Sequence, residues 1–511
     1  MSILLALVIQ VPVLAQPHFE IAKVDQVGTS FNTVTCTIHE NLSGLFAYTG
    51  GDSNKIDVFT IGADGKLSPL DTYVVTGEKQ GVRGLITDQI DGKDFLFAGL
   101  KGGNAIEVFE IAPDGRLKSV FVFEDTDETH LVRVITLQVV HMKSGSYLFA
   151  GGLESSPGLD SFRIHTDGSL ELVQAMPDTK DTFTDGVIGM SIHRIAGQTY
   201  LFTGGFQDNG LSSWRVYEDG KFENVSNVGD DATRFLNGAY PVISSAVKDW
   251  NFVVVGHRHH SYYRPTAWVK DRYTYYYHGD AVSVFWVNPD GQLVPRSVFQ
   301  GNSETLIKGQ TRLQRLPIDE NFDLVAVATR DDESIQLCSL NETGRLANAG
   351  KLSIGFPVYY GLTGRKIGDS LFLFAGSVEG NEFVSYRLDL KSAEIDNGAN
   401  LPAVVENNNT QVLRHVVAFR FKADVSDARI QQAVQDFRGL AELIPEIKRF
   451  EGGKNLSTMS KNKEFTHWFV LTFDNEEARD IYLPHPDHMR VVEKNKPLLA
   501  DLLVAEYWGE E

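Results

Sequence analysis

Cysteine is scarce in this chain, with only Cys36 and Cys338 among 511 residues. The two lie far apart in sequence, so we expect two buried small apolar side chains rather than a disulfide. Basic residues are also in the minority, because 47 Lys and Arg face 67 Asp and Glu, for a formal net charge of −20. The resulting negative field repels polyanions, which argues against general nucleic-acid binding.

Long apolar runs and common catalytic motifs are missing as well. Residues 1–17 are apolar and contain the small-residue pattern Val13-Leu14-Ala15, so they are a candidate signal peptide. They lack a basic beginning, and a periplasmic or secreted protein and a cytoplasmic one both stay open. No other segment looks transmembrane, so we expect no membrane partner. The chain has no G-x-S-x-G elbow, Walker loop, H-E-x-x-H or EF-hand loop, and we expect neither a metal nor a cofactor.

A unit of about fifty residues repeats along most of the chain. Each copy has an apolar strand, a Gly-rich break, an alternating strand and a turn, usually Asp-Gly. The turns begin at Asp64, Asp114, Asp167, Asp219, Asp290, Thr343 and Asp389. Their spacing is 46–53 residues, except for one interval of 71. Seven units of four short strands predict a mainly β fold, a seven-bladed β-propeller over residues 18–395.

The last unit has no convincing fourth strand after Asp389. Residues 18–28 precede the first unit and resemble the fourth strands elsewhere. We therefore predict that they form the outer strand of the last blade, which would close the ring and cover an exposed edge.

Two of the repeats carry a family resemblance. The segments NKIDVFTIGADGKL (54–67) and NAIEVFEIAPDGRL (104–117) resemble lactonase-type propellers, the 6-phosphogluconolactonase-like family. The resemblance covers about residues 18–395 and implies the same fold. It also implies that the protein acts on or binds a sugar lactone or another anionic carbohydrate.

The long interval contains GHRHHSYYRPTAWVKDRYTYYYHGD (256–280), a basic, aromatic insertion in an acidic chain. Three hypotheses stay open for it. Aromatic rings and arginines suit a carbohydrate or an anion. His257 with His259 or His260 would suit a metal ion. A packing loop or an oligomer contact would also use Tyr and Arg.

The insertion joins strands two and three of its blade, on the face that also receives the loops leading to the innermost strands. We expect side chains from both sets of loops to converge at the mouth of the central channel, around a small ligand. The substrate-binding candidates are Arg83, Arg133, Tyr240, Arg258, Arg264, Arg312 and Tyr359.

The catalytic candidates at this mouth are Asp185, His257, His259 and Tyr263. Asp185 or a histidine would activate water for lactone hydrolysis while an arginine steadies the oxyanion. A His base with a Tyr acid would instead suit a polysaccharide lyase acting on uronates. Binding of a carbohydrate or a protein without turnover is the third alternative.

The sequence pattern changes after a polar linker at residues 396–410. Residues 411–511 read as strand, helix, two strands, helix and strand, which predicts an α+β ferredoxin-like unit. Ser426 is the expected N-cap of a helix over 426–443. Asn475 is the expected N-cap of a second helix.

This unit resembles a stress-responsive A/B barrel domain, a dimeric α+β barrel. The matching residues are His415-Val416-Val417, Gly453-Lys454-Asn455, Thr466-His467 and Tyr482-Leu483-Pro484-His485-Pro486-Asp487-His488. The resemblance implies a homodimer and a pocket with His415, His467, Tyr482 and His488. In a plant polyketide cyclase of this family a histidine and a tyrosine at the places of His488 and Tyr482 do the chemistry. Members without known activity carry the same residues, so we favour structural roles for His415, His467 and His485.

Overall fold

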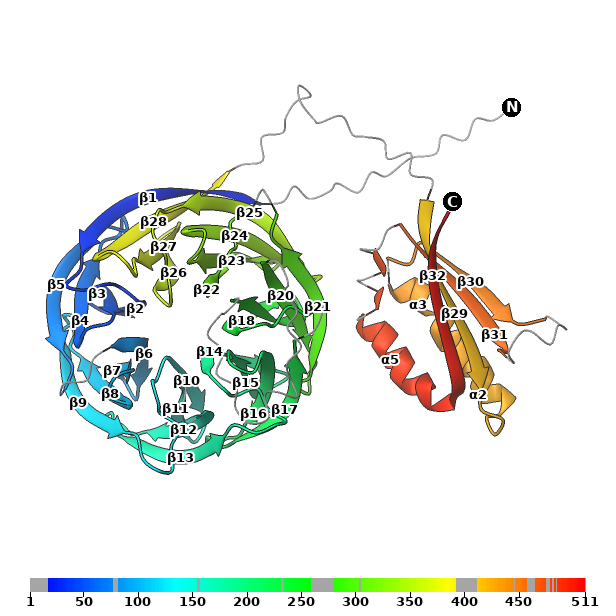
Figure 1. Ribbon diagram of the computed structural model, residues 1–511, viewed down its shortest axis with the longest axis horizontal. Coiled ribbons are helices and arrows are strands. Elements are labelled where there is room, and N and C mark those ends of the chain that lie inside the picture. The colour runs from blue at the N-terminus through cyan, green and yellow to red at the C-terminus, as the bar shows by residue number, and fades with distance from the viewer. Residues whose placement is uncertain are drawn as a thin grey trace, which may run out of the picture. The chain divides into compact units, whose positions relative to one another are not determined.

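The computed structural model describes residues 17–76, 81–153, 157–230, 234–258, 280–302, 305–391, 411–444, 446–456, 465–474, 478–479, 482–483 and 485–510. The chain divides into two compact units, Met1–Glu394 and Ile395–Glu511 (Figure 1). Residues 1–16 of the candidate signal peptide (1–17) and all of the predicted linker (396–410) lie outside the described residues. No helix among the described residues is long and apolar enough to cross a bilayer.

The first unit is a ring of seven four-stranded antiparallel sheets, as predicted (Figure 1). Blades 1 and 2 are β2 (Thr35–Asn41), β3 (Gly44–Gly50), β4 (Lys55–Ile61) and β5 (Leu67–Val74), then β6 (Val82–Ile90), β7 (Lys93–Leu100), β8 (Ala105–Ile111) and β9 (Leu117–Glu124). Blades 3 and 4 are β10 (Thr136–Met142), β11 (Gly145–Gly151), β12 (Gly158–Ile164) and β13 (Leu170–Pro177), then β14 (Val187–Ile195), β15 (Gln198–Gly205), β16 (Gly210–Val216) and β17 (Phe222–Gly229). Blades 5 and 6 are β18 (Ala239–Val247), β19 (Trp250–His257), β20 (Ala281–Val287) and β21 (Leu293–Gln300), then β22 (Gln310–Pro317), β23 (Phe322–Thr329), β24 (Ser334–Asn341) and β25 (Leu346–Ser353). Blade 7 is β26 (Leu362–Ile367), β27 (Ser370–Gly376), β28 (Glu382–Lys391) and β1 (His18–Gly28).

Strand β1 joins the two ends of the ring. It pairs antiparallel with β28 from His18 opposite Lys391 to Gly28 opposite Glu382. Phe19 and Ile21 are buried in an apolar cluster shared with blade 6. On the other side the Asp25 carboxylate accepts a hydrogen bond from the backbone N–H of Leu67 in blade 1, at 2.9 Å. One strand therefore bonds or packs against the first and the last two blades.

The Asp-Gly turns are fixed by conformation and by packing. Gly115 has φ +85°, and a Cβ at this position would lie 2.2 Å from the Phe46 ring of blade 1. The Asp114 side chain accepts the backbone N–H of Arg116 at 3.2 Å, which closes the turn. Gly220 has φ +79° and lies equally close to the Tyr147 ring of the previous blade. The repeat is thus visible in the sequence because each turn also contacts its neighbouring blade.

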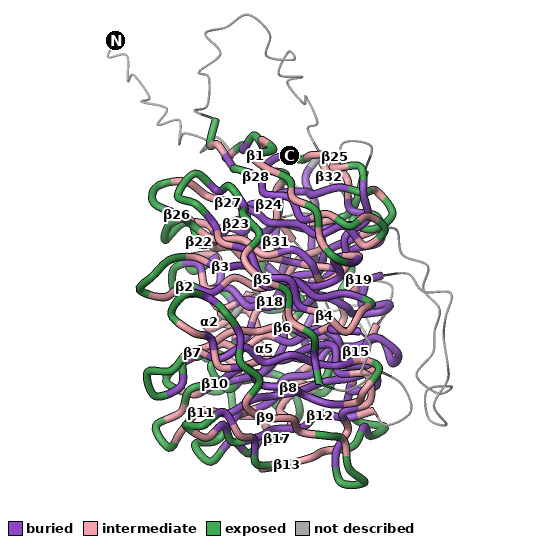
Figure 2. The backbone as a smooth tube through the Cα atoms, turned by 90° about the vertical axis from the view of Figure 1, so that its left-hand side faces the viewer, coloured by how far each residue is buried: buried purple, intermediate pink, exposed green. Residues whose placement is uncertain are grey.

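The core of the propeller lies between blades. Figure 2 shows buried backbone through the strand centres and exposed residues gathered at the strand ends. Cys36 and Cys338 are both buried and unpaired, which confirms the prediction from their scarcity.

The second unit has the predicted ferredoxin-like order. It contains β29 (Gln411–Phe421), α2 (Asp427–Arg438), α3 (Leu440–Leu443), β30 (Arg449–Lys454), β31 (His467–Phe473), α5 (Pro486–Asn495), a 3-10 turn (Lys496–Leu498) and β32 (Leu499–Glu510). The sheet order is β30-β31-β29-β32, and helices α2 and α5 pack on one face (Figure 1).

The first helix of this unit differs from the prediction. It ends at Arg438, and the short helix α3 follows Gly439. Glycine in a helix interior is destabilising, which favours a break there. Ser426 is the N-cap residue, although its side chain makes no capping hydrogen bond. The Asn475 prediction falls outside the described residues.

Candidate functional sites

Aromatic side chains from several blades meet at the centre of one propeller face. Tyr240, at the start of β18, stacks on Tyr360, before β26, with ring centroids 5.4 Å apart and planes at 20°. Phe206 meets the edge of Tyr240 at 5.6 Å. Ile135 and Ile188 complete this small apolar cluster. Blades 3, 4, 5 and 7 contribute, so the face has a common centre.

Two arginine side chains lie against the faces of the tyrosine rings. The guanidinium carbon of Arg258 lies 5.1 Å from the ring centroid of Tyr359 and 5.9 Å from that of Tyr240. Arg330 lies 5.4 Å from the same Tyr359 ring. A guanidinium group bound to aromatic faces can still direct its in-plane N–H groups to an oxygen ligand.

Two more arginines reach the same cluster. Arg312, on β22, interacts electrostatically with Cys36, Tyr240 and Tyr360, and burial lowers the pKa of its guanidinium. Its Nε has no hydrogen-bond partner among the described residues. Arg83, on β6, forms an ion pair with Asp52 and also acts electrostatically on Tyr360.

Tyr240, Tyr360 and Cys36 of this cluster are protonated at neutral pH. Burial raises the pKa of Tyr240 and of Tyr360 above the ordinary tyrosine range. Burial also raises the pKa of the Cys36 thiol to about 12. The cluster therefore offers cationic and neutral hydrogen-bond donors, and such a donor set favours an anionic or hydroxylated partner.

The structure brings together Arg83, Tyr240, Arg258, Arg312 and Tyr359 of the predicted substrate-binding residues. Tyr360 and Arg330 were missed. Tyr360 follows Tyr359 directly, and this tyrosine pair was the available signal. Arg330 directly follows β23, without any distinctive pattern around it.

Arg133 and Asp185, two other predicted site residues, form backbone hydrogen bonds within the propeller. Arg133 has φ +52°, and its backbone N–H donates to the Asn104 side chain at 3.1 Å. Asp185 is buried, and its carbonyl accepts the backbone N–H of Gln207 at 2.9 Å. No contact described for either side chain places it in the arginine cluster, so their proposed roles in ligand chemistry stay predictions.

His257 braces the start of the insertion. Its side chain is 1% exposed, and its Nε2 accepts the backbone N–H of Ala281 at 2.9 Å. Gln310 strengthens the same closure by donating from its amide to the Ala281 carbonyl at 2.6 Å. The structure thus shows His257 bracing the two strands at the start of the insertion, and its catalytic role stays a prediction.

The insertion joins β19 to β20, strands two and three of blade 5, as predicted. His259, Tyr263 and Arg264 lie in its 259–279 segment, outside the described residues.

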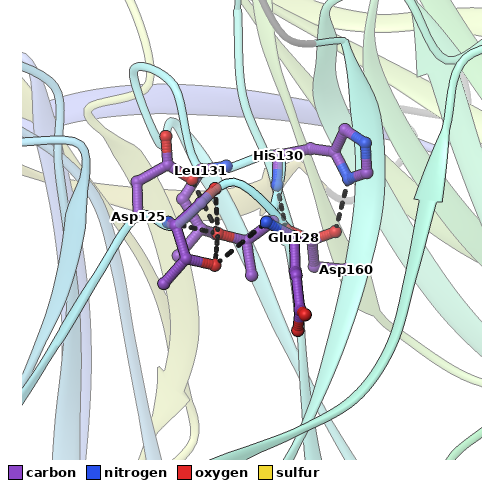
Figure 3. A network of polar contacts seen from close by, with 7 residues as sticks. Asp125, Glu128, His130, Leu131 and Asp160 are labelled. Atoms are coloured by element: carbon purple, nitrogen blue, oxygen red, sulfur yellow. Dashed lines mark hydrogen bonds and ion pairs between the residues drawn. The ribbon is translucent and has the colours of Figure 1, made fainter.

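His130 and Asp160 form a hydrogen-bonded pair of the type found in catalytic dyads. A contact at the same strand position holds a loop in other blades, so we interpret the pair as structural. Asp160, on β12, accepts both the backbone N–H of His130 at 2.6 Å and its ring Nδ1 at 2.8 Å (Figure 3). Asp125 holds the same loop by accepting from Thr129 and from the Leu131 backbone (Figure 3).

The matching position of the third strand holds the incoming loop in other blades. Asp57 accepts the backbone N–H of Ser30, and Glu107 accepts that of Thr76. Ser212 and Gln336 do the same in blades 4 and 6. Since the residue type varies while the bond remains, Asp160 is best explained as a loop tether.

The second unit carries a separate cluster beneath its helices. The Tyr482 ring lies 4.2 Å from the His488 ring and 5.7 Å from the His415 ring, centroid to centroid. His415 Nδ1 bonds Glu506 at 2.7 Å, and Arg479 also pairs with Glu506. His467 lies on β31 against Phe421, and no described contact joins it to Tyr482 or His488.

The protonation states in this cluster are defined by burial. His488 Nδ1 donates to the Leu483 carbonyl at 2.7 Å, which leaves the Nε2 lone pair available. Burial, with a smaller effect of His415 and His485, lowers the pKa of His488. Burial raises the pKa of Tyr482, whose hydroxyl has no partner among the described residues. A neutral imidazole thus lies beside a neutral phenol. His485 instead caps α5 by accepting the Asp487 N–H at 3.2 Å.

Fold and sites define a two-domain protein, a seven-bladed propeller followed by a ferredoxin-like domain with a histidine–tyrosine cluster. Residues 413–508 match the family model of the Stress responsive A/B Barrel Domain. Stress-response A/B barrel domain-containing protein HS1 from Arabidopsis thaliana is 32% identical over 95 residues, which are 19% of this chain and 87% of that protein. The chain therefore belongs to the stress-responsive A/B barrel family through its second domain.

Two further proteins are each similar to one of the two domains. Olivetolic acid cyclase from Cannabis sativa is 24% identical over 95 residues, covering 19% of this chain and 94% of the enzyme. A structure of a proposed 6-phosphogluconolactonase from Bacteroides uniformis ATCC 8492 covers 59% of this chain and 80% of its own, with 17% identity and a TM-score of 0.43. The propeller assignment itself rests on the seven sheets.

Proposed function

We propose that the propeller binds an anionic carbohydrate, a sugar acid or its lactone, at the cluster of Tyr240, Arg258, Arg312, Tyr359 and Tyr360. The observation that carries the proposal is the way the arginines are held. Arg258 is positioned by two tyrosine faces, and the buried Arg312 Nε has no described partner. Guanidinium groups arranged in this way can bind a carboxylate or a phosphate in bidentate fashion.

The tyrosines supply the second half of the recognition. A sugar presents apolar ring faces together with hydroxyl groups, and aromatic rings pack well against such faces. The hydroxyls of Tyr240 and Tyr360 stay protonated. A hydroxylated anion therefore matches this cluster better than an apolar acid does.

Binding is favoured over turnover by the chemistry of the described residues. Lactone hydrolysis needs a group that accepts a proton from water. Among the described cluster residues, Arg258, Tyr240 and the Cys36 thiol are protonated at neutral pH and cannot take this proton. Hydrolysis or uronate elimination would need Asp185 or a residue of the 259–279 segment, such as His259 or Tyr263.

Calorimetric titration of the full chain with gluconate, glucuronate and glucose tests the proposal. Glucuronate should bind, glucose should bind far more weakly, and Arg312→Met should weaken the affinity for glucuronate at least about tenfold. Arg116→Gln is the matched control, because this exposed arginine lies in the turn between β8 and β9. Equal affinity for glucose and glucuronate, or an unchanged Kd in Arg312→Met, would overturn the assignment. Acid release from gluconolactone in the same samples would favour a hydrolase.

A second candidate function lies in the A/B barrel domain. We infer that its pocket binds a small aromatic or apolar molecule, with Tyr482 donating a hydrogen bond and His488 accepting one. The buried, unpartnered Tyr482 hydroxyl carries this proposal, because such groups are rarely left unsatisfied. Ligand-detected NMR with resorcinol should show binding that Tyr482→Phe weakens while the melting temperature stays the same. Equal binding to both proteins would contradict it.

We further propose that the A/B barrel domain makes the protein a homodimer. Strand β32 forms the edge of its sheet, and Leu502, Val504, Tyr507 and Trp508 are 44–54% exposed along it. Exposed apolar side chains in one stretch favour a protein contact. Light scattering of the full chain should give a dimer mass, which Val504→Asp should halve. Leu390→Asp is the control, since Leu390 is 60% exposed on the propeller. A monomeric wild-type chain would refute the proposal.

A further inference from the structure

A serine, a histidine and an aspartate form a continuous hydrogen-bonded chain across blades 2 and 3. His141 Nδ1 lies 2.9 Å from the Ser146 hydroxyl, and His141 Nε2 lies 2.9 Å from a carboxylate oxygen of Asp88. His141 and Ser146 are directly opposite on the β10–β11 hairpin, while Asp88 comes from β6 of the neighbouring blade. These residues lie at the turns between first and second strands, not among the loops that carry the arginine cluster.

The hydrogen bonds define the role that each group can play. The Asp88 oxygen that faces His141 also accepts the Gln89 backbone N–H at 2.7 Å, which orients the carboxylate. A carboxylate accepts only, so Nε2 of His141 carries the proton and Nδ1 presents a lone pair to the Ser146 hydroxyl. A serine–histidine–aspartate triad uses the same three groups, here with the two ring nitrogens exchanged, and a neutral Nδ1 beside the hydroxyl can act as the base for a serine nucleophile.

A surface basin of about 490 Å³ lies beside the serine. His141, Ser146, Lys143 and Arg163 are among its lining residues. This volume is within the range that holds a small organic molecule. The two cations can offset negative charge that develops on a bound ester oxygen.

The fold does not require this arrangement. At the same register next to the turn, the other hairpins carry different pairs. These are Glu40–Leu45, Gln89–Asp94, Arg194–Thr199, Ala246–Asn251 and Lys366–Leu371.

His39 and His193 also bridge blades, by pairing with Asp94 and Asn251. A bridge between blades accounts for the contact of His141 with Asp88. It does not account for the Ser146 hydroxyl on the other ring nitrogen of His141, nor for the basin that both residues line. His141 is also 53% exposed, so a ligand can reach it.

We propose that Ser146, His141 and Asp88 form a second site that hydrolyses small carboxylic esters through an acyl-serine. Ser146 Oγ attacks the ester carbonyl, and its proton passes to His141 Nδ1. The tetrahedral intermediate collapses, the alkoxide leaves with the proton from Nδ1, and the acyl group stays on Ser146. Water then attacks the acyl-serine, His141 takes its proton and returns it to Ser146 Oγ, and the carboxylic acid departs. Asp88 is a positioning residue that holds the imidazole.

The test is acylation of the full chain by p-nitrophenyl acetate, followed by release of p-nitrophenol and by mass mapping of the acetylated peptide. We expect acetyl on Ser146 and a loss of at least about tenfold in acylation rate in Ser146→Ala and in His141→Gln. Asp88→Asn should lower the rate, and Asp88→Glu should recover part of it, which a purely structural bridge would not do. Ser169→Ala is the matched control, because the Ser169 hydroxyl bonds the Asp167 carboxylate at 2.6 Å.

Melting temperatures separate this proposal from a folding effect. If Ser146→Ala lowers the melting temperature, the acylation rate of folded His141→Gln decides between the two explanations, because this variant keeps the serine. Acetylation spread evenly over surface residues, or a rate unchanged in folded His141→Gln, would overturn the proposal.

Discussion

The two candidate binding sites use polar groups in opposite ways. The propeller cluster holds Arg258 and Arg312 near tyrosine rings, so its character is permanent positive charge. The A/B barrel cluster holds a neutral imidazole at His488 and a neutral phenol at Tyr482, so it is uncharged near neutral pH. The first arrangement suits binding of an anion, and the second suits hydrogen bonding to an uncharged ligand. Ligand charge should therefore matter at the propeller, and solution pH at the A/B barrel.

The largest expected effect is a loss of stability in the propeller that leaves the stability of the A/B barrel domain unchanged. Deleting residues 17–28 removes β1, including buried Phe19 and Ile21, and opens the ring. Phe19→Ala alone should lower the free energy of unfolding by about 3–5 kcal/mol, and the deletion should lower it further. Calorimetry of the full chain should show the propeller transition shifted down and the A/B barrel transition unmoved. A single transition that shifts as a whole would contradict the division into two units.

A smaller loss of stability is expected from the loop tether in blade 3. Asp160→Asn replaces a carboxylate that accepts two bonds from His130 and should cost about 1–3 kcal/mol. Ser212→Ala, at the matching position of blade 4, removes one bond and should cost less. Denaturant unfolding measures both, and Asp167→Asn in an exposed turn is the control. If Asp160→Asn leaves stability unchanged, the histidine–aspartate pair needs an explanation other than tethering.

The sequence predicted the repeating blades and part of the cluster at the centre of the ring, but not all of that cluster. The Asp-Gly turns show seven blades because Gly115 and its equivalents need positive φ and close packing against the previous blade. The missing last strand predicted β1 because a sheet edge must be covered. Tyr360 and Arg330 escaped because neighbours at the centre of the ring come from loops without periodicity. His257 was assigned to chemistry because its insertion is unusual, and its burial at the end of β19 is a feature that the sequence pattern did not reveal.

Replacing Arg258 tests whether the planar guanidinium group, and not charge alone, determines binding at the propeller. Arg258→Lys keeps a cation but loses the planar group that lies against Tyr240 and Tyr359. Because lysine does not bind a carboxylate in bidentate fashion, the affinity for glucuronate should fall about tenfold, or about 1.4 kcal/mol. Arg258→Gln should bind more weakly still, and Arg116→Lys should match the wild type. Equal Kd values for Arg258→Lys and the wild type would mean that charge alone determines binding.

The smallest effect concerns pH and the A/B barrel pocket. The pKa of folded His488 lies below its unfolded value of 6.5, so in the interval between the two the unfolded chain binds more protons. Stability contributed by this residue is therefore present above pH 6.5 and is lost as the pH falls through that interval. Each unit of difference in pKa is worth about 1.4 kcal/mol. His488→Gln should thus reduce the drop in A/B barrel melting temperature between pH 7.5 and pH 5.

His467, whose pKa burial also lowers, leaves part of that drop in place. The double variant His467→Gln with His488→Gln should then be flatter than either single variant. The propeller transition is the internal reference, because His193 there has a lowered pKa and is unchanged in all these proteins. If His488→Gln melts with the same pH dependence as the wild type, burial does not hold His488 neutral, and the contrast between a charged propeller cluster and a neutral A/B barrel cluster loses its second half.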